Sequence, residues 1–248
     1  MNYVSFSLFG DRPDYCVGAI RNAEQIKKFY PGFVPLFYTG PGVPESCLEE
    51  LKKLGSKFSS LDASKITSLR MWRFAGIEET DASIVLVRDV DSRFSDREVR
   101  AVEQWIESDE LFHVMRDYSG HNTLIMAGMW GWKKRLGTLG MSDLMANYLE
   151  QNPAHSGSDQ WFLSDIIWPK IKHSVMQHDS FFRDRYPGAI PFPNGDDSPE
   201  GLFVGERVDA NENPEKFVRQ ARRVGKRADE IVWSNELCEP FEKRRKNI

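Results

Sequence analysis

Residues 83–93 read Ser-Ile-Val-Leu-Val-Arg-Asp-Val-Asp-Ser-Arg, and this stretch decides both the fold and the expected site. An apolar run bounded by polar residues predicts a strand buried on both faces, as in parallel sheets. In open α/β sheets, reactive groups collect beyond the carboxyl ends of such strands. Asp89 and Asp91 are therefore expected at the edge of a cleft.

Two neighbouring carboxylates repel each other unless a cation or a proton lies between them. Hard oxygen ligands with this spacing favour Mg²⁺ or Mn²⁺, and both ions also bind phosphate. The residues alone thus predict a metal-dependent enzyme for a phosphorylated substrate. Asp89 and Asp91 are the predicted metal ligands, and Arg88 beside them is a further candidate for the phosphates.

The segments on either side of this stretch alternate between strand and helix patterns. Before it, we predict strands at 3–9, 33–39 and 57–61, with helices at 14–30, around 48–54 and at 64–80. After it, we predict strands at 111–116 and 174–177, with helices at 95–109, 141–150 and from 158, where Ser158 is the expected N-cap. This alternation predicts an α/β fold with a parallel sheet covered by helices.

The C-terminal part differs in composition. Several prolines between 187 and 199 mark a long loop, and the chain from Lys216 onward holds ten Lys and Arg against five Asp and Glu. We therefore expect a core at 1–180, with a proline-rich loop and a basic helical extension at 181–248 packed on the same domain.

Composition and charge exclude several classes of protein. A net charge of −4 gives no electrostatic case for nucleic acid. No run approaches the ~18 apolar residues of a membrane span. The first residues show no secretory pattern, and three scattered cysteines form neither a disulfide framework nor a zinc motif. We expect a soluble cytoplasmic protein of unspecified oligomeric state.

Other polar groups extend the candidate site. Arg70 and Arg73 lie three residues apart on one predicted helical face, which suits a phosphate. Asp159-Gln160 opens a helix, where the acid either complements the helix dipole or contacts a sugar or acceptor. His178 follows a predicted strand, and a His ligand would favour Mn²⁺ over Mg²⁺. Gly128 belongs to a glycine-punctuated run that favours close backbone approach to a ligand or strand.

In this order the motifs resemble the GT-A glycosyltransferases, particularly the retaining glycogenin-like and lipopolysaccharide galactosyltransferase family. The resemblance covers residues 1–180 and rests on Arg73, Asp89-Val90-Asp91, Ala127-Gly128-Met129, Asp159-Gln160 and His178. Met126 stands where the family has Asn, and the family's Lys-Pro-Trp after the His has no counterpart.

The resemblance implies a GT-A, Rossmann-like mixed sheet, mostly parallel, with helices on both faces. It implies a hexosyltransferase that uses a nucleotide-diphosphate sugar, most simply a UDP-sugar, with retention. The implied metal is Mn²⁺ (or Mg²⁺), held by Asp89, Asp91 and His178. The implied partners are the nucleotide-sugar donor and a carbohydrate or other hydroxyl acceptor.

The same resemblance implies roles for the remaining residues. Arg73 would bridge the donor sugar and its phosphates, and Asp159 and Gln160 would lie near the sugar as catalytic groups. Asp117, at a predicted strand end, is a second candidate for a contact to a sugar hydroxyl. Arg183 or Arg185 is a candidate for the missing diphosphate-binding Lys.

Two alternatives remain open at this point. A haloacid-dehalogenase-like Mg²⁺-dependent phosphatase also uses an Asp-x-Asp after a hydrophobic strand. In that class the motif lies near the start of the chain, with Thr or Val where Arg93 stands here. The other alternative is a non-enzymatic protein that binds a carbohydrate or a partner, with structural aspartates.

Overall fold

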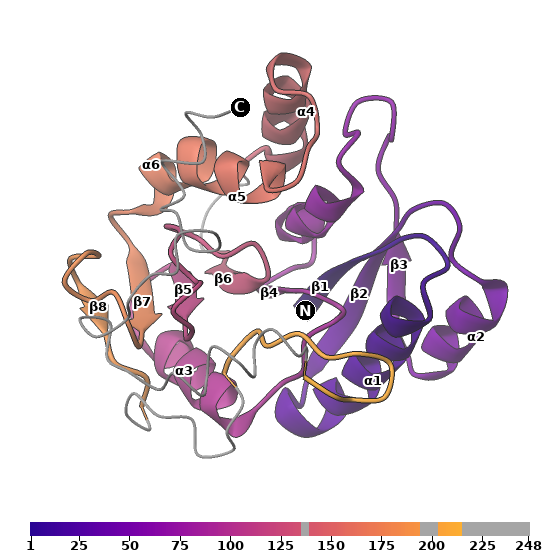
Figure 1. Ribbon diagram of the computed structural model, residues 1–248, viewed down its shortest axis with the longest axis horizontal. Coiled ribbons are helices and arrows are strands. Elements are labelled where there is room, and N and C mark those ends of the chain that lie inside the picture. Colours follow the sequence, from indigo (N-terminus) through magenta and orange to yellow (C-terminus); the bar gives the residue numbers. More distant parts are fainter. Residues whose placement is uncertain (135–138, 194–202, 215–248) are drawn as a thin grey trace.

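The computed structural model describes residues 1–134, 139–193 and 203–214 of the protein. Its helices and strands follow in the order β1 (Asn2–Leu8), α1 (Pro13–Phe29), β2 (Phe33–Thr39), α2 (Glu45–Lys53), β3 (Lys57–Ser59), η1 (Leu69–Glu78), β4 (Ile84–Arg88), α3 (Asp96–Glu107), β5 (Phe112–Arg116), β6 (Met129–Lys133), α4 (Met141–Gln151), α5 (Ser158–Phe162), η2 (Leu163–Ile167), α6 (Trp168–Ile171), β7 (Val175–Asp179) and β8 (Ala189–Ile190). The predicted alternation of strands and helices is confirmed as far as β5, which the unpredicted strand β6 follows without a helix between them (Figure 1).

These strands form one mixed, mostly parallel sheet in the order β3-β2-β1-β4-β6-β5-β7-β8. Only β6 runs against its neighbours, because it pairs antiparallel with both β4 and β5. The carboxyl ends of β1, β4, β5 and β7 therefore share one edge of the sheet, and β6 begins at that edge.

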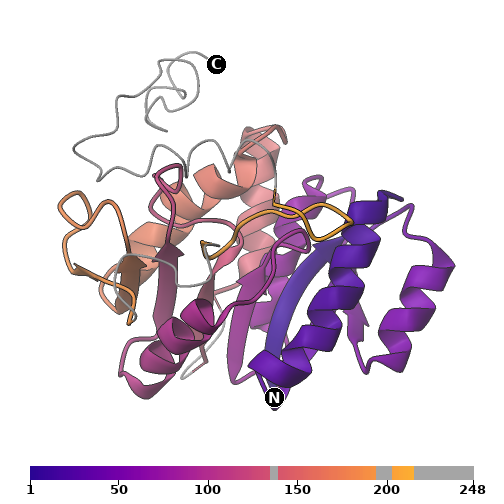
Figure 2. The same ribbon diagram turned by 60° about the horizontal axis from the view of Figure 1, so that its bottom comes forward.

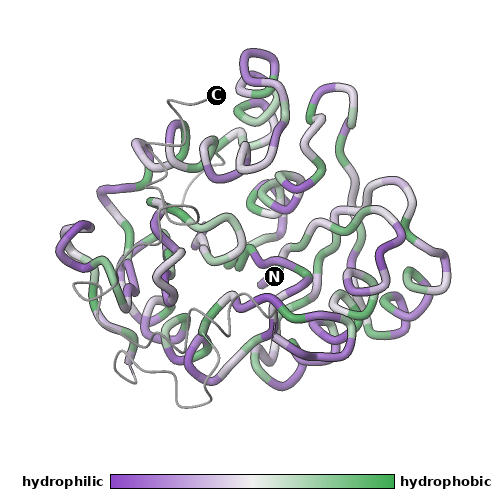
Figure 3. Tube along the Cα trace, in the orientation of Figure 1, coloured by the Kyte–Doolittle hydropathy of each residue, from purple (hydrophilic) through white to green (hydrophobic). Residues whose placement is uncertain are grey.

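Helices cover both faces of the sheet. Figure 2 shows α1, α2 and α3 in front of the strands, with the salmon-coloured helices α4–α6 behind them. Strand β1 shows why two cores form, since Val4, Phe6 and Leu8 pack with α1 and α3 on one face. Tyr3 packs on the other face, with η1 and α4. The peripheral helices alternate between hydrophilic and hydrophobic residues along their length (Figure 3), as amphipathic helices do.

Strand β4 is buried on both faces, as residues 83–93 predict. Val85 and Val87 lie in one core and Leu86 in the other. Ser95 caps α3, because its hydroxyl accepts a hydrogen bond from the backbone N–H of Glu98. Residues 1–134 contain no helix that is long and apolar enough to span a membrane, and neither do 139–193 or 203–214.

The predicted helix at 64–80 is wrong in type and length. The chain there forms a 3₁₀ helix, η1, over Leu69–Glu78. Hydroxyls of β1 hold its backbone, since Ser5 donates to the carbonyl of Arg73 and Ser7 to that of Arg70. A Cβ on Gly76 would lie 2.7 Å from Ser5 Oγ, so the glycine permits this close approach.

Two boundaries also differ from the predictions. Gly157, in the left-handed conformation, is the N-cap of α5, while Ser158 exchanges hydrogen bonds with His155. Strand β7 continues through His178 to Asp179 because both residues pair with β5. The predicted basic helical extension lies outside the described residues. Residues 181–193 and 203–214 add β8 to the sheet and bury Phe192 and Val204 in one core.

The buried pair of Arg88 and Glu98 generates a stability prediction. Arg88 Nε lies 2.7 Å from Glu98 Oε1, and both side chains are 2% exposed. Glu98→Ala should lower the free energy of unfolding by about 3–5 kcal/mol, because the guanidinium would stay buried without its partner. Urea unfolding measures this, with exposed Glu103→Ala on the same helix as the matched control. Equal effects of the two substitutions would contradict the prediction.

Candidate active site

A cleft of about 370 Å³ opens where the carboxyl ends of β1 and β4 meet η1 and α5. Asp89 and Asp91 line it directly after β4, as predicted. The predicted residues Arg70, Arg73, Gly128, Asp159 and Gln160 line the same cleft. The fold thus gathers these groups from segments that are up to 90 residues apart in the sequence.

Arg73 connects the parts of this cleft. Its Nη1 lies 3.0 Å from Asp89 Oδ1, and its Nη2 lies 3.5 Å from Asp159 Oδ2. Its Nε donates to the carbonyl of Ala127 at 3.3 Å. The residue is 5% exposed, so these acceptors offset most of the cost of burying its charge. One guanidinium therefore sets the positions of two carboxylates and the 126–128 backbone.

The backbone of Arg73 is fixed as firmly as its side chain. Its N–H donates to Ser7 Oγ at 2.9 Å, and its carbonyl accepts from Ser5 Oγ at 2.7 Å. Both serines alternate with apolar residues along β1, so they face η1 while their neighbours face the other core. The alternating first strand thus contributes to the site through η1.

Asp89 and Gly128 lie in close contact. A Cβ built on Gly128 would lie 1.9 Å from Asp89 Oδ2, so any side chain larger than hydrogen would displace the carboxylate from its position beside Arg73. The predicted close approach of this glycine is therefore to the carboxylate itself.

Asp91 pairs with a residue that lies far along the chain. Its Oδ2 is 2.6 Å from Arg207 Nε, and its carbonyl accepts from the N–H of Val208. Burial raises the pKa of the Asp91 carboxyl to about 6, and the charge of Asp89 adds to the shift, while Arg207 and Arg73 oppose it. The two carboxylates are therefore close enough to repel each other.

The sequence reasoning missed several residues of the cleft: Arg12, Tyr15, His121 and Arg207. Arg12 lies three residues beyond the first predicted strand, so the rule that sites form beyond strand ends could have found it. Arg207 carried no such signal, because only the fold brings residues 203–214 beside 91–93. Arg12 is exposed and pairs with Asp14.

Several predicted site residues lie elsewhere, and His178 is the clearest case. Strands β6 and β5 separate β7 from β4, which places His178 roughly 14 Å from the aspartates at ordinary strand spacing. Its ring nitrogens lie 2.8 Å from His113 Nε2 and 3.1 Å from Gln104 Oε1. Burial, followed by the charge of Arg97, lowers the pKa of His178 to about 4, so it is a neutral core residue.

Arg88 and Asp117 also lie outside the cleft. Arg88 points into the core and binds Glu98 and the carbonyl of Trp130. Asp117 forms a bidentate pair with Arg97 at 2.8 Å and accepts from the N–H of Val204. Both residues therefore hold the fold around the cleft and have no direct access to it.

The donor set of the cleft fits a hard divalent cation in part. Asp89 and Asp91 supply carboxylate oxygens, and their mutual repulsion favours a cation between them. Among residues 1–134, 139–193 and 203–214, no three His, Cys, Asp or Glu side chains cluster as a complete set of metal ligands. Mg²⁺ needs only one or two carboxylates when waters and substrate phosphates complete its coordination. Two aspartates therefore suffice for a metal bound together with a phosphorylated ligand.

Asp91 generates a prediction for the pH dependence of stability. Its folded pKa of about 6 exceeds the ordinary 3.8, so the folded protein holds this proton more tightly and loses stability as pH rises from about 4 to 6. Asp91→Asn removes this cost. The variant should exceed the natural protein by up to about 2–3 kcal/mol at pH 7.5 and match it near pH 4.

Urea unfolding at pH 4, 6 and 7.5 measures this difference, with exposed Asp143→Asn as the control. A less stable Asp91→Asn protein at pH 7.5 would mean that the ion pair with Arg207 outweighs the repulsion from Asp89.

Comparisons with known proteins identify the fold. No family model matches the sequence. No curated protein matches it either. Among solved structures, the galactosyltransferase LgtC in complex with donor and acceptor sugar analogs is similar at 14% identity, over 99% of this chain and 100% of that chain, with a TM-score of 0.50.

Two further structures are similar over part of the chain. A glycosyltransferase involved in glycosylation of the major capsid of PBCV-1 matches at 14% identity, over 75% of this chain and 87% of that chain, with a TM-score of 0.43. Glucosyl-3-phosphoglycerate synthase from Mycobacterium tuberculosis, in complex with Mn²⁺, UDP and glucosyl-3-phosphoglycerate, matches at 12% identity, over 71% and 68%, with a TM-score of 0.44. The full-length similarity to LgtC and the mixed eight-stranded sheet agree: the protein has the GT-A fold that the sequence motifs predicted.

Proposed function

We propose that the protein is a glycosyltransferase that moves a sugar from a nucleotide-diphosphate donor, most simply a UDP-sugar, to a hydroxyl acceptor. One observation carries the proposal. Arg73 joins Asp89 and Asp159 in a cleft at the carboxyl edge of the sheet, where α/β folds bind nucleotides. The GT-A fold supports the same reading.

The arginines of the cleft suit the diphosphate of such a donor. Arg70 is exposed on η1 at the cleft, and Arg12 and Arg207 line it as well. Guanidinium groups bind phosphate oxygens in a planar, bidentate manner, which fixes orientation as well as charge. We assign the phosphates to this part of the cleft and the sugar to the part near Asp159 and Gln160.

A divalent cation, Mn²⁺ or Mg²⁺, belongs to the proposal. Asp89 and Asp91 would hold it, and when bound it would neutralise the diphosphate as a Lewis acid. The exposed Asp89 side chain (43%) and the raised pKa of Asp91 support this assignment. His178 has no part in it, because both of its ring nitrogens already have partners, His113 and Gln104.

Asp159 and Gln160 are the proposed groups for the sugar. Asp159 is held by Arg73, and its Oδ1 accepts from the backbone N–H of Gln160 at 3.0 Å. A fixed carboxylate can bind sugar hydroxyls and stabilise positive charge that develops at the anomeric carbon. Retention of configuration is part of the proposal on the strength of the family resemblance.

The cellular setting is also a proposal. Cys16 and Cys47 are free thiols in the structure, which fits a reducing compartment such as the cytoplasm. We assign catalysis to residues 1–180, with residues 181–193 and 203–214 packed on the same domain. Residues 203–214 contribute Arg207 to the cleft.

The first test is thermal stabilisation by nucleotides. UDP and GDP, each with and without Mn²⁺, are compared on the natural protein, Asp91→Asn and Asp143→Asn. At 100 times its dissociation constant, the bound nucleotide should raise the melting temperature by about 5–10 °C. Asp91→Asn should lose the Mn²⁺-dependent part of this shift, and Asp143→Asn should keep it.

Other outcomes would favour the alternatives. Mg²⁺-dependent hydrolysis of p-nitrophenyl phosphate, without a nucleotide shift, would indicate a phosphatase. No shift with any nucleotide and no such hydrolysis would favour a non-enzymatic binding protein.

A second test concerns Arg70. Arg70→Ala should weaken UDP binding about tenfold or more, because a charged hydrogen bond to phosphate contributes about 1.5–3 kcal/mol. Stability should be unchanged, since the side chain is exposed. Isothermal titration calorimetry measures the affinity, with exposed Arg100→Ala on α3 as the control. Equal affinity in both variants would place the phosphates elsewhere.

A further inference from the structure

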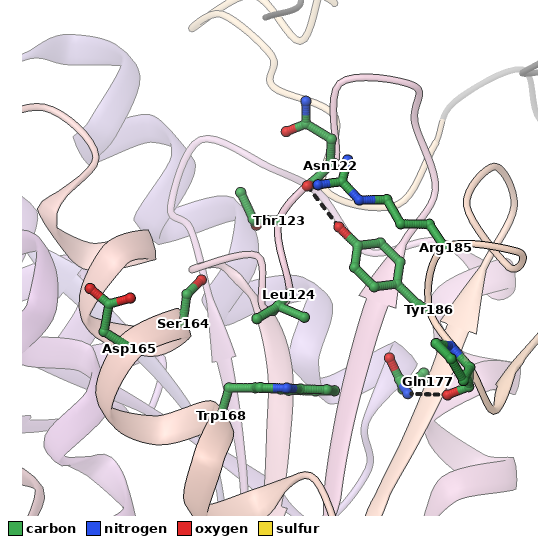
Figure 4. A pocket seen from close by; sticks show the side chains of 10 residues that line it. Asn122, Thr123, Leu124, Ser164, Asp165, Trp168, Gln177, Arg185 and Tyr186 are labelled. Carbon is green, nitrogen blue, oxygen red and sulfur yellow. Dashed lines mark hydrogen bonds between the residues drawn. The ribbon is translucent and has the colours of Figure 1, made fainter. Parts of the chain in front are cut away.

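A second cavity, of about 410 Å³, lies beside the candidate active site. Residues 117–128 connect β5 to β6 and contribute to both hollows. His121 and residues 126–128 line the cleft, whereas Asn122, Thr123 and Leu124 line the cavity. We call it the Trp168 cavity, because the indole of Trp168 lies across its base (Figure 4). No residue of the described chain lines both hollows.

The wall formed by β5 and β7 is held by one buried side chain, Arg116. Its Nε lies 2.5 Å from Asp179 Oδ2, and its Nη2 donates to Gln177 Oε1 at 2.7 Å. Its Nη1 donates to the carbonyl of Leu124 at 2.6 Å, and its guanidinium carbon lies 3.9 Å from the centre of the Tyr186 ring. Three lining residues from different segments therefore keep fixed positions.

The loop beyond β7 is tied to the same wall. The Tyr186 hydroxyl donates to the carbonyl of Asn122 at 2.7 Å, and Gln177 Nε2 donates to the carbonyl of Pro187 at 3.3 Å (Figure 4). The cavity is thus preorganised, which lowers the entropic cost of binding a ligand.

The opposite wall is an irregular helix. Between α5 and α6 the chain widens to the π-helical segment η2, over Leu163–Ile167. Pro169 explains the widening, because it has no N–H to donate to the carbonyl of Asp165 four residues earlier. Single π-helical turns inside helices occur frequently at functional sites. Here the irregular turn carries Ser164 and Asp165 to the cavity.

Ser164 leaves a buried hydrogen-bonding group unused. Its Oγ exposes less than 1 Å² to solvent and has no hydrogen-bond partner in the described part of the chain. In Figure 4 the hydroxyl points from the helix toward Thr123 and Leu124. Buried hydroxyls without partners are rare because they lose free energy relative to water. A ligand hydroxyl in the cavity would satisfy this group.

The lining favours a neutral, hydroxyl-rich ligand. An indole and Leu124 offer apolar surface to the C–H face of a ring, and hydroxyl and amide groups surround them. Asp165 and Arg185 bring one charge of each sign, so the cavity has no net preference for an anion such as phosphate. Its volume lies in the usual range of small-molecule sites, ~300–1,000 Å³.

We propose that the Trp168 cavity binds a sugar residue of the acceptor, on the side of residues 117–128 away from the donor cleft. The assignment to the acceptor rests on the proposed glycosyltransferase function, whereas saccharide binding itself does not. The enzyme would then recognise an acceptor glycan at a second sugar residue, apart from the one that receives the transferred sugar.

The test is binding of the full-length protein to an array of defined glycans, followed by saturation-transfer difference NMR on the glycans that bind. Trp168→Ala should reduce binding at least tenfold. Trp161→Ala, on the same helical run but outside both hollows, should bind like the natural protein. Ser164→Ala, which removes only the unpaired hydroxyl, should bind about three- to tenfold more weakly, at a melting temperature equal to or above that of the natural protein because the unpaired buried group is gone.

UDP-induced stabilisation is measured on the same variants and should persist in Trp168→Ala. Glycan binding by the natural protein without any UDP effect would refute the donor assignment and leave the cavity as a saccharide site. Absence of glycan binding, or equal binding by the natural protein, Ser164→Ala and Trp168→Ala, would overturn the proposal.

Discussion

The contacts of Arg73 are the constraint on which the candidate active site depends. A guanidinium that is 5% exposed must find acceptors inside the protein, and it finds them directly after β4, on α5 and on residues 117–128. These segments are separate in the sequence. Leaving such a charge unpaired would cost free energy, so the fold is favoured only when these segments come together around Arg73. The packing of both halves of the sheet thus determines the geometry of the cleft.

The antiparallel strand β6 explains why two hollows lie side by side. Because β5 ends and the antiparallel β6 begins at the same edge of the sheet, residues 117–128 stay at that edge as they connect the two strands. This connection runs between the cleft and the Trp168 cavity and contributes residues to each. Gly128 lets it pass against Asp89, and Arg116 holds it at Leu124. Its path thus sets the boundary between the two.

Much of the fold was predictable because the periodic signals were strong. The apolar run of β4, the capping Ser95 and the strand at Phe33–Thr39 all lie where the patterns placed them. The 3₁₀ segment η1 was not predictable, since hydrogen bonds from Ser5 and Ser7 on a distant strand hold its backbone. Helix propensity is judged from a short stretch of neighbouring residues, so it cannot reveal a hydrogen-bond partner that lies some 65 residues away.

The sequence by itself determined that Asp89 and Asp91 follow a buried strand, and the order of motifs indicated the GT-A fold. It also selected Arg73 and Asp159-Gln160, which converge in the cleft. Only the tertiary structure decided that His178 lies in the core. The order of the strands in the sheet sets its distance from β4, and that order cannot be read from the spacing of residues along the chain. For the same reason, only the fold brought Arg207 to Asp91.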